Sequence, residues 1–143
     1  MSYKVEVLIP KSVLYEVVTG DHSLEEIAGV MTDIVQFLDT CEKDEGIILT
    51  NLTQLKGVPI KLMEVRNATE PMLRHENYKC MVGYGSSDKV VINFLANAIA
   101  GIFKQPIKMF ATEAEALKYI IAQKPDLAES LPQALRRVQN VSR

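Results

Sequence analysis

The sequence has no long run of lysine or arginine. Its 143 residues include 16 basic and 18 acidic side chains, which give a formal net charge of −2. The two signs are mixed along the chain, so no segment offers the continuous positive surface that binds a nucleic-acid backbone. We therefore expect no nucleic-acid partner. A chain of this length is near the typical size of one domain with a single core.

Long apolar runs are absent as well. No uninterrupted apolar segment approaches the ~20 residues that a helix needs to span a bilayer. The N-terminal segment, residues 1–13, has only a short apolar run, which charged residues and Pro10 interrupt, and so differs from a signal peptide. These absences predict a cytoplasmic protein without membrane insertion.

Cysteine and histidine are scarce. The two cysteines, Cys41 and Cys80, have no CxxC spacing and fall in predicted regular elements, so we expect both to be reduced packing residues. The two histidines lie in or near predicted loops and do not have the spacing of a zinc site. No activated nucleophile or acid/base pair is recognisable. The sequence therefore predicts no enzyme activity, no metal and no cofactor.

The chain begins with the pattern of a hairpin followed by a helix. Side chains alternate over residues 3–9, and β-branched and aromatic residues follow over 13–19, so these runs predict an antiparallel pair of strands. Ser23 and Glu26 then form a capping box at the start of an amphipathic helix over 24–40.

Strands and helices alternate after that helix. Short apolar runs predict buried strands at 46–53, 78–84 and 107–111. Helical spacing predicts helices at 59–73, 86–103 and 113–124. Pro71 should kink or split the first of these helices. This order predicts an α/β fold with a mixed, mostly parallel five-stranded sheet, an antiparallel hairpin at its edge and packed helices.

The last part of the chain keeps leucines at helical spacing beyond Pro125. We expect residues 1–124 to form one α/β domain and residues 125–143 to form a C-terminal helical tail. Three arrangements of the tail remain open: packing on the domain, binding a partner, or forming a separate short helix.

The helix predicted at 86–103 is apolar over most of its circumference. A helix that covers a sheet needs only one apolar face, so neighbouring helices, a ligand or another subunit must cover the surplus. One interpretation is a central core helix, which is the commoner case in proteins. The other is a homodimer interface, whose candidate residues are Ile92, Ala96, Ile99 and Phe103.

A glycine- and serine-containing turn precedes this helix. Backbone N–H groups at such a turn, together with the helix dipole, favour a phosphate or carboxylate. The candidate ligand-binding residues are Gly83, Gly85, Ser86 and Ser87. The turn lacks the P-loop lysine and the GxGxxG spacing, so a plain turn with a serine cap is the alternative. An apolar ligand would lie beside the helix, among dispersed methionines and phenylalanines.

Three segments carry a resemblance to a known family. They are GIILTNLTQL, in which Asn51, Leu52 and Thr53 correspond to an Asp-Leu-Ser type turn, YKCMVGYG before the apolar helix, and IKMFATEAEALKYI. Over roughly residues 3–122 the chain resembles the STAS-like superfamily of anti-sigma-factor antagonists. It is most similar to the small stand-alone relatives with a lipid-carrier-like fold.

The resemblance implies a STAS-like fold and a regulatory role. Anti-sigma-factor antagonists carry a phosphorylatable serine in a turn before the second helix. The matching loop, residues 55–59, has no hydroxyl side chain, and Thr53 lies before it, so the resemblance does not bring that switch to this chain. We expect a non-enzymatic cytoplasmic regulatory or protein-interaction module of STAS-like type, as a homodimer. The alternative is a protein that binds or carries a small apolar or anionic ligand.

Overall fold

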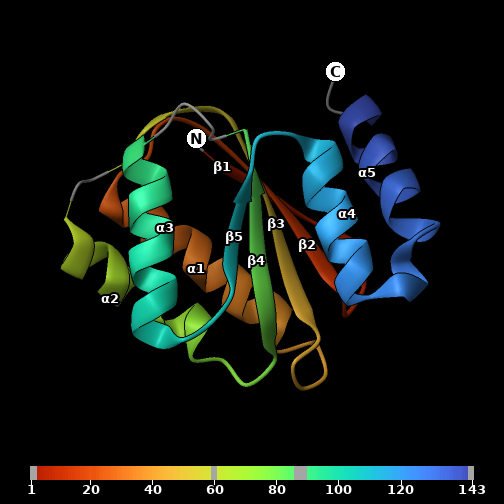
Figure 1. Ribbon diagram of the computed structural model, residues 1–143, viewed down its shortest axis with the longest axis horizontal. Coiled ribbons are helices and arrows are strands. Elements are labelled where there is room, and N and C mark those ends of the chain that lie inside the picture. The colour runs from red at the N-terminus through yellow and green to blue at the C-terminus, as the bar shows by residue number, and fades with distance from the viewer. Residues whose placement is uncertain (1–2, 59–60, 86–89, 142–143) are drawn as a thin grey trace.

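The computed structural model describes residues 3–58, 61–85 and 90–141, which form a five-stranded sheet with helices on both faces (Figure 1). The strands are β1 (Tyr3–Ile9), β2 (Val13–Asp21), β3 (Gly46–Gly57), β4 (Tyr78–Tyr84) and β5 (Ile107–Phe110). They lie in the order β1-β2-β3-β4-β5, with β1 antiparallel to β2 and every other pair parallel. The predicted fold class is confirmed.

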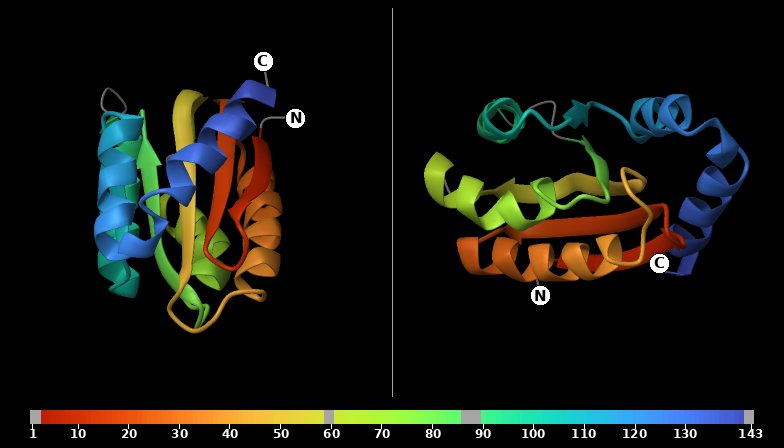
Figure 2. Two further views of the ribbon diagram at one scale, coloured as in Figure 1. Left: turned by 90° about the vertical axis from the view of Figure 1, so that its right-hand side faces the viewer. Right: turned by 90° about the horizontal axis from the view of Figure 1, so that it is seen from below.

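Five α-helices and one 3₁₀ turn complete the described part of the chain. They are α1 (Leu24–Leu38), α2 (Leu62–Leu73), α3 (Val90–Phe103), α4 (Glu113–Gln123), the 3₁₀ turn η1 (Pro125–Leu127) and α5 (Ser130–Val141). Helices α1, α2 and α3 lie on one face of the sheet, and α4 and α5 lie on the other (Figure 1). Helix α5 crosses the sheet at its β1 edge (Figure 2).

Side-chain caps fix the starts of two helices. The Ser23 hydroxyl accepts a hydrogen bond from the Glu26 N–H, and the Glu26 side chain accepts one from the Ser23 N–H, so the predicted capping box is confirmed. Thr112 caps α4 by accepting from the Glu115 N–H at 3.2 Å. The predicted cap of α3 at Ser86 or Ser87 lies outside the described residues.

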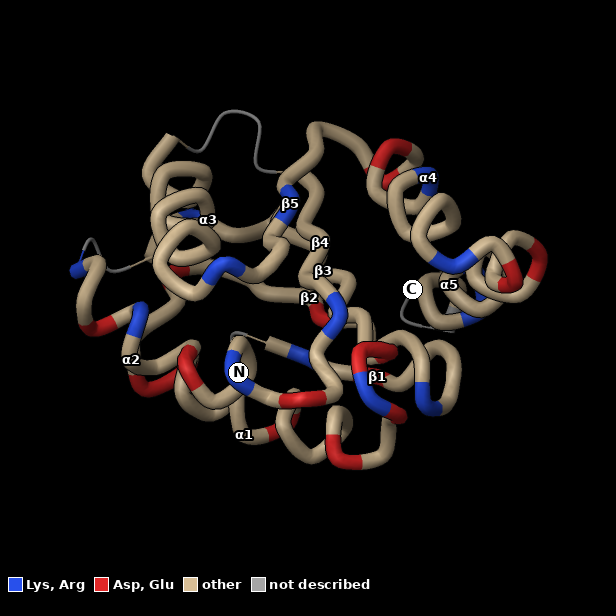
Figure 3. Tube along the Cα trace, turned by 60° about the horizontal axis from the view of Figure 1, so that its bottom comes forward, with Lys and Arg blue, Asp and Glu red and all other residues tan. Residues whose placement is uncertain are grey.

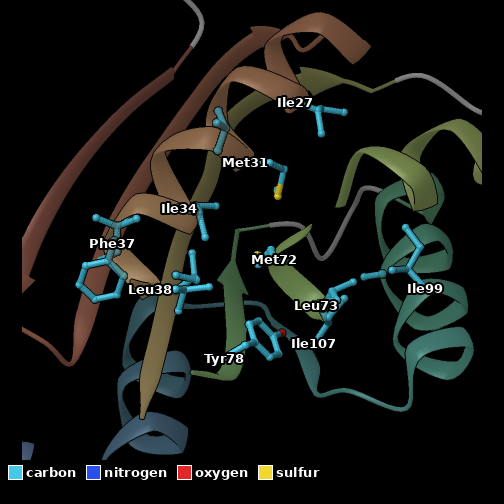
Figure 4. Close-up of a cluster of buried hydrophobic side chains, with 14 of the residues drawn as sticks. Ile27, Met31, Ile34, Phe37, Leu38, Met72, Leu73, Tyr78, Ile99 and Ile107 are labelled. Carbon is cyan, nitrogen blue, oxygen red and sulfur yellow. The ribbon is translucent and has the colours of Figure 1, made fainter. Parts of the chain in front are cut away.

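The sheet separates two apolar cores, because successive residues of a strand point to opposite faces. On the α1 side, buried side chains of three helices meet those of the sheet (Figure 4). They include Ile27, Ile34, Leu38, Met72, Leu73 and Ile99 of the helices and Ile107 of β5. On the α4 side, the buried residues include Val13, Tyr15, Ile47, Leu49, Ile120, Leu131 and Leu135. Each fully buried aliphatic side chain contributes about 1.5–3 kcal/mol.

The strand predicted at 46–53 is longer in the structure. β3 continues to Gly57, so Lys56 and Gly57 belong to the strand and not to the loop expected there, because β2 runs beside it as far as Asp21. Helix α2 is continuous and is not split at Pro71, and a kink there stays a prediction. Pro71 lies in the last turn of the helix, where its missing N–H removes a single hydrogen bond.

The C-terminal segment packs on the domain. Leu131, Ala134 and Leu135 of α5 are buried in the α4-side core. Pro132 lies in the first turn of this helix, where an N–H needs no intrahelical partner. Of the three arrangements left open for the tail, the structure shows packing on the sheet. The division of the chain at residue 124 stays a prediction.

Within the described ranges, no helix combines the length and the apolar composition required to cross a bilayer. Cys41 and Cys80 are both free and buried. Burial raises the pKa of the Cys80 thiol to about 11 and also raises the pKa of Cys41. Both thiols are therefore inert packing groups at neutral pH, as the sequence predicted.

Candidate functional site

Helix α3 exposes an uncharged apolar surface. We call the outward side chains of Val90, Val91, Phe94 and Ile102 the α3 stripe; Val90 is 77% exposed, Phe94 62% and Ile102 45%. Ala98 lies between them on the same helical face. The segment from Val90 to Phe103 contains no ionisable residue, and α3 is tan along its length in Figure 3. Exposed apolar surface of this kind on one face is typical of an interaction site.

Three of the four predicted interface residues lie on the opposite side of α3. Ala96 and Ile99 are buried in the α1-side core, and Ile99 is only 3% exposed (Figure 4). Ile92 is partly buried and packs on the small cluster formed around Val18 and Leu52. The role of these residues in an interface stays a prediction. The surplus apolar surface that the sequence indicated is displayed by the α3 stripe.

Phe103, the fourth predicted residue, is held against helix α2. The guanidinium carbons of Arg66 and Arg74 lie 4.9 Å and 5.2 Å from the centre of its ring. Glu70 lies between the two arginines, at 3.1 Å from Arg66 and 3.3 Å from Arg74. These cation–π contacts fix the end of α3 on α2.

The turn predicted to bind an anion is described only in part. Gly83 is buried at the end of β4, where a Cβ would lie 2.5 Å from the Met109 sulfur. Gly85 has a φ of +84°, and a Cβ there would lie 2.5 Å from Thr53 Cγ2. Ser86 and Ser87 lie outside the described residues. The backbone therefore requires glycine at Gly85, whereas Gly83 packs closely on the flexible Met109 side chain, and anion binding at the turn stays a prediction.

A polar pocket of about 430 Å³ lies on the other face of the sheet. Strand register builds its floor, because Lys4, Val17 and Asn51 are neighbours across β1, β2 and β3, with Tyr84 next in the row. Glu6 and Tyr15 form the adjacent row. The remaining lining residues come from the second half of β3 and from two helices: Gln54, Glu113, Val138 and Gln139.

A chain of hydrogen bonds runs along one wall of this polar pocket. Asn51 Nδ2 donates to the Tyr15 hydroxyl at 3.1 Å, and the Tyr15 and Tyr84 hydroxyl oxygens are 3.0 Å apart. Tyr84 donates to Glu113 Oε2 at 3.4 Å, and Gln139 Nε2 donates to the same oxygen at 2.8 Å. Burial and the contact with Tyr15 raise the pKa of Tyr84 well above its usual range. Tyr84 is therefore a neutral donor that fixes the Glu113 carboxylate at the pocket.

Other titratable groups are structural. Glu16, on the α1 side of β2, is buried and accepts a hydrogen bond from Thr50 at 2.9 Å; burial raises its pKa to about 7. Burial lowers the pKa of His22. His75 Nε2 lies 2.7 Å from Asp39 Oδ1. Among the described residues, no group of three or more potential ligands could hold a metal ion.

Sequence patterns did not identify the polar pocket. Lys4 lies on a strand, Asn51 lies in the middle of another strand and Glu113 lies at the capped start of a helix, and each has an ordinary role within its own element. The pairing of β1, β2 and β3 aligns the first two, and α4 brings Glu113 over the sheet. The alternation in β1 does place Lys4 and Glu6 on one face, which is the one signal available before the structure.

Solved structures with the same fold were found by comparison. No protein-family model matches the chain, and no curated protein matches it. An uncharacterized protein of the DUF3478 family with a SpoIIAA-like fold, from Shewanella loihica PV-4, has a TM-score of 0.61 at 15% identity. The match covers 83% of this chain and 94% of that one.

Two further matches are structures of SpoIIAA. The anti-sigma factor antagonist SpoIIAA in its unphosphorylated form has a TM-score of 0.52 at 13% identity, over 82% of this chain and 96% of that one. The Bacillus cell fate determinant SpoIIAA in its phosphorylated form has a TM-score of 0.51 at 13% identity, over 82% and 98%. The chain therefore has a STAS-like fold of the SpoIIAA type, as the resemblance implied.

Proposed function

We propose that this protein is a non-enzymatic regulatory or protein-interaction module of STAS-like type, which acts in the cytoplasm as a homodimer. The α3 stripe carries the proposal, because it places four apolar side chains in solvent on one side of a helix. The likeness to anti-sigma factor antagonists supports a regulatory role, although fold alone does not determine function. Two free, buried cysteines suit a reducing compartment.

A second copy of the chain is the occupant that suits the α3 stripe. In a two-fold dimer the same patch meets itself, so a charge near the two-fold axis would oppose its own copy. Helix α3 carries no charge between Val90 and Phe103 and avoids this repulsion. Ala98 and Gly101 are small, and a Cβ at Gly101 would meet nothing within 4 Å. Small residues beside Phe94 and Ile102 allow two helices to approach closely and interlock.

Sedimentation velocity over a range of protein concentrations tests the proposal, with Phe94→Asp as the disrupting variant. Because Phe94 is 62% exposed, the variant should fold normally. A carboxylate at the centre of an apolar interface should weaken dimerisation at least about thirtyfold, or about 2 kcal/mol. Ala122→Asp is the matched control, because it adds the same charge to an exposed position of α4, on the other face of the sheet.

The wild type and Ala122→Asp should form dimers at concentrations where Phe94→Asp is monomeric. A wild type that is monomeric at every concentration would refute the homodimer, and dimers that persist in Phe94→Asp would place the interface elsewhere.

A further inference from the structure

The polar pocket has charges at its ends and amides between them. At one end, β1 provides the Lys4 ammonium group and, two residues along the same face, the Glu6 carboxylate. At the other end, the Glu113 carboxylate is fixed by hydrogen bonds from Tyr84 and Gln139, both to Oε2. A carboxylate accepts about four hydrogen bonds, so Glu113 retains capacity for a ligand.

Side-chain amides line the space between these ends. The Asn51 amide donates one N–H to Tyr15, which leaves its second N–H for a ligand carbonyl. Gln54, in the second half of β3, offers both a donor and an acceptor. Such groups match the N–H and C=O groups of a peptide backbone. The apolar lining is limited to Val17 and Val138, which suit small side chains.

The span of the polar pocket sets the length of the ligand. The Tyr84 hydroxyl contacts the Tyr15 hydroxyl and also donates to Glu113. The Glu113 carboxylate therefore lies above the middle of the sheet, about two strands from Lys4. Two strand spacings correspond to about 10 Å. An extended chain spans about 3.3–3.6 Å per residue, so three residues cover this distance.

We propose that the polar pocket binds a short linear peptide with free ends, of two or three small residues. The peptide's ammonium group binds Glu113, its carboxylate binds Lys4, and its amides bind Asn51 and Gln54. This inference is independent of the proposed dimer, because the α3 stripe is on the other face of the sheet (Figure 1).

Three matched probes test the proposal by NMR titration of the isotope-labelled protein: trialanine, N-acetyl-trialanine and trialanine amide. Trialanine should bind saturably, with shifts centred on the pocket. Acetylation, which removes the ammonium charge, should weaken binding at least about tenfold, and amidation, which removes the carboxylate, should do the same.

Variants then assign each end of the peptide. Glu113→Gln should bind trialanine more weakly than the wild type does, and it should bind trialanine and N-acetyl-trialanine with equal affinity. Lys4→Gln should bind trialanine and trialanine amide with equal affinity. Lys118→Gln, at an exposed position of α4, is the control for the loss of one charge and should behave as the wild type. The NMR spectrum also reports whether each variant is folded.

Three outcomes would overturn the proposal. The first is no saturable binding of trialanine up to about 10 mM, which corresponds to a binding free energy weaker than about 3 kcal/mol. The second is equal binding of all three probes. The third is an acetylation penalty that is unchanged in Glu113→Gln. Phe94→Asp should retain peptide binding, so failure of this proposal and failure of the dimer are distinguishable.

Discussion

Glu16 makes the stability of this protein depend on pH near neutrality. Its carboxyl group is 3% exposed, lies between Val5 of β1 and Thr50 of β3, and accepts a hydrogen bond from Thr50. Burial disfavours the charged form and raises the pKa from its usual 4.5 to about 7.

The direction of the effect follows from proton binding. Between pH 4.5 and about 7 the folded protein keeps the Glu16 proton that the unfolded chain has released. Raising the pH through this window therefore favours unfolding. Below this window Glu16 is protonated in both states and does not lower the free energy of unfolding. Above the window Glu16 lowers the free energy of unfolding by about 3 kcal/mol, because each unit of pKa shift corresponds to about 1.4 kcal/mol.

Glu16→Gln removes this titration while keeping an oxygen that can accept from Thr50. The free energy of unfolding of the variant, measured relative to that of the wild type, should rise by up to about 3 kcal/mol when the pH is raised from about 4 to about 8. Urea unfolding at the two pH values, at one protein concentration, measures the gain. Glu42→Gln, at an exposed position, is the control for the loss of one carboxylate. A difference between Glu16→Gln and wild type that is the same at both pH values would refute the reasoning.

Three further substitutions test the packing. Ile99→Asp places a charge in the α1-side core, so it should lower the free energy of unfolding by at least about 4 kcal/mol or abolish folding. Urea unfolding measures this loss, and a variant as stable as the wild type would show that Ile99 is not a core residue. Leu131→Ala should cost about 2–5 kcal/mol by the same measurement if the tail belongs to the folded core, and a neutral effect would indicate a detachable tail. Gly85→Ala should cost about 1–3 kcal/mol, because of its positive φ and the contact with Thr53, and should leave dimerisation unchanged in sedimentation.

The order of strands and helices was predictable because each element has a clear local pattern. Alternation in β1, the capping box at Ser23 and the apolar runs of β3 to β5 arise from short-range physics that a sequence displays directly. The end of β3 was not predictable in the same way. Lys56 and Gly57 resemble a loop, and they extend the strand only because β2 offers hydrogen-bonding partners as far as Asp21.

The candidate sites were harder to predict, since both depend on direction and register. Helix α3 is apolar nearly all round, so its sequence does not reveal that Ile99 faces the sheet and Phe94 faces solvent. In the polar pocket, the register of three strands places Lys4 and Asn51 in one row, on either side of Val17. A shift of one residue in that register would place Asn51 on the other face.

Disulfide formation across the proposed two-fold axis tests the central claim most directly. Ala98 lies midway between Phe94 and Ile102, so in a symmetric pair of α3 helices it should meet its own copy. Cys41 and Cys80 are buried and should not compete. Under mild oxidation Ala98→Cys should give a covalent dimer that reductant dissolves, while the exposed control Ala122→Cys on α4 should stay monomeric on a denaturing gel. No covalent dimer of Ala98→Cys, or equal cross-linking of Ala122→Cys, would contradict a homodimer built on the α3 stripe.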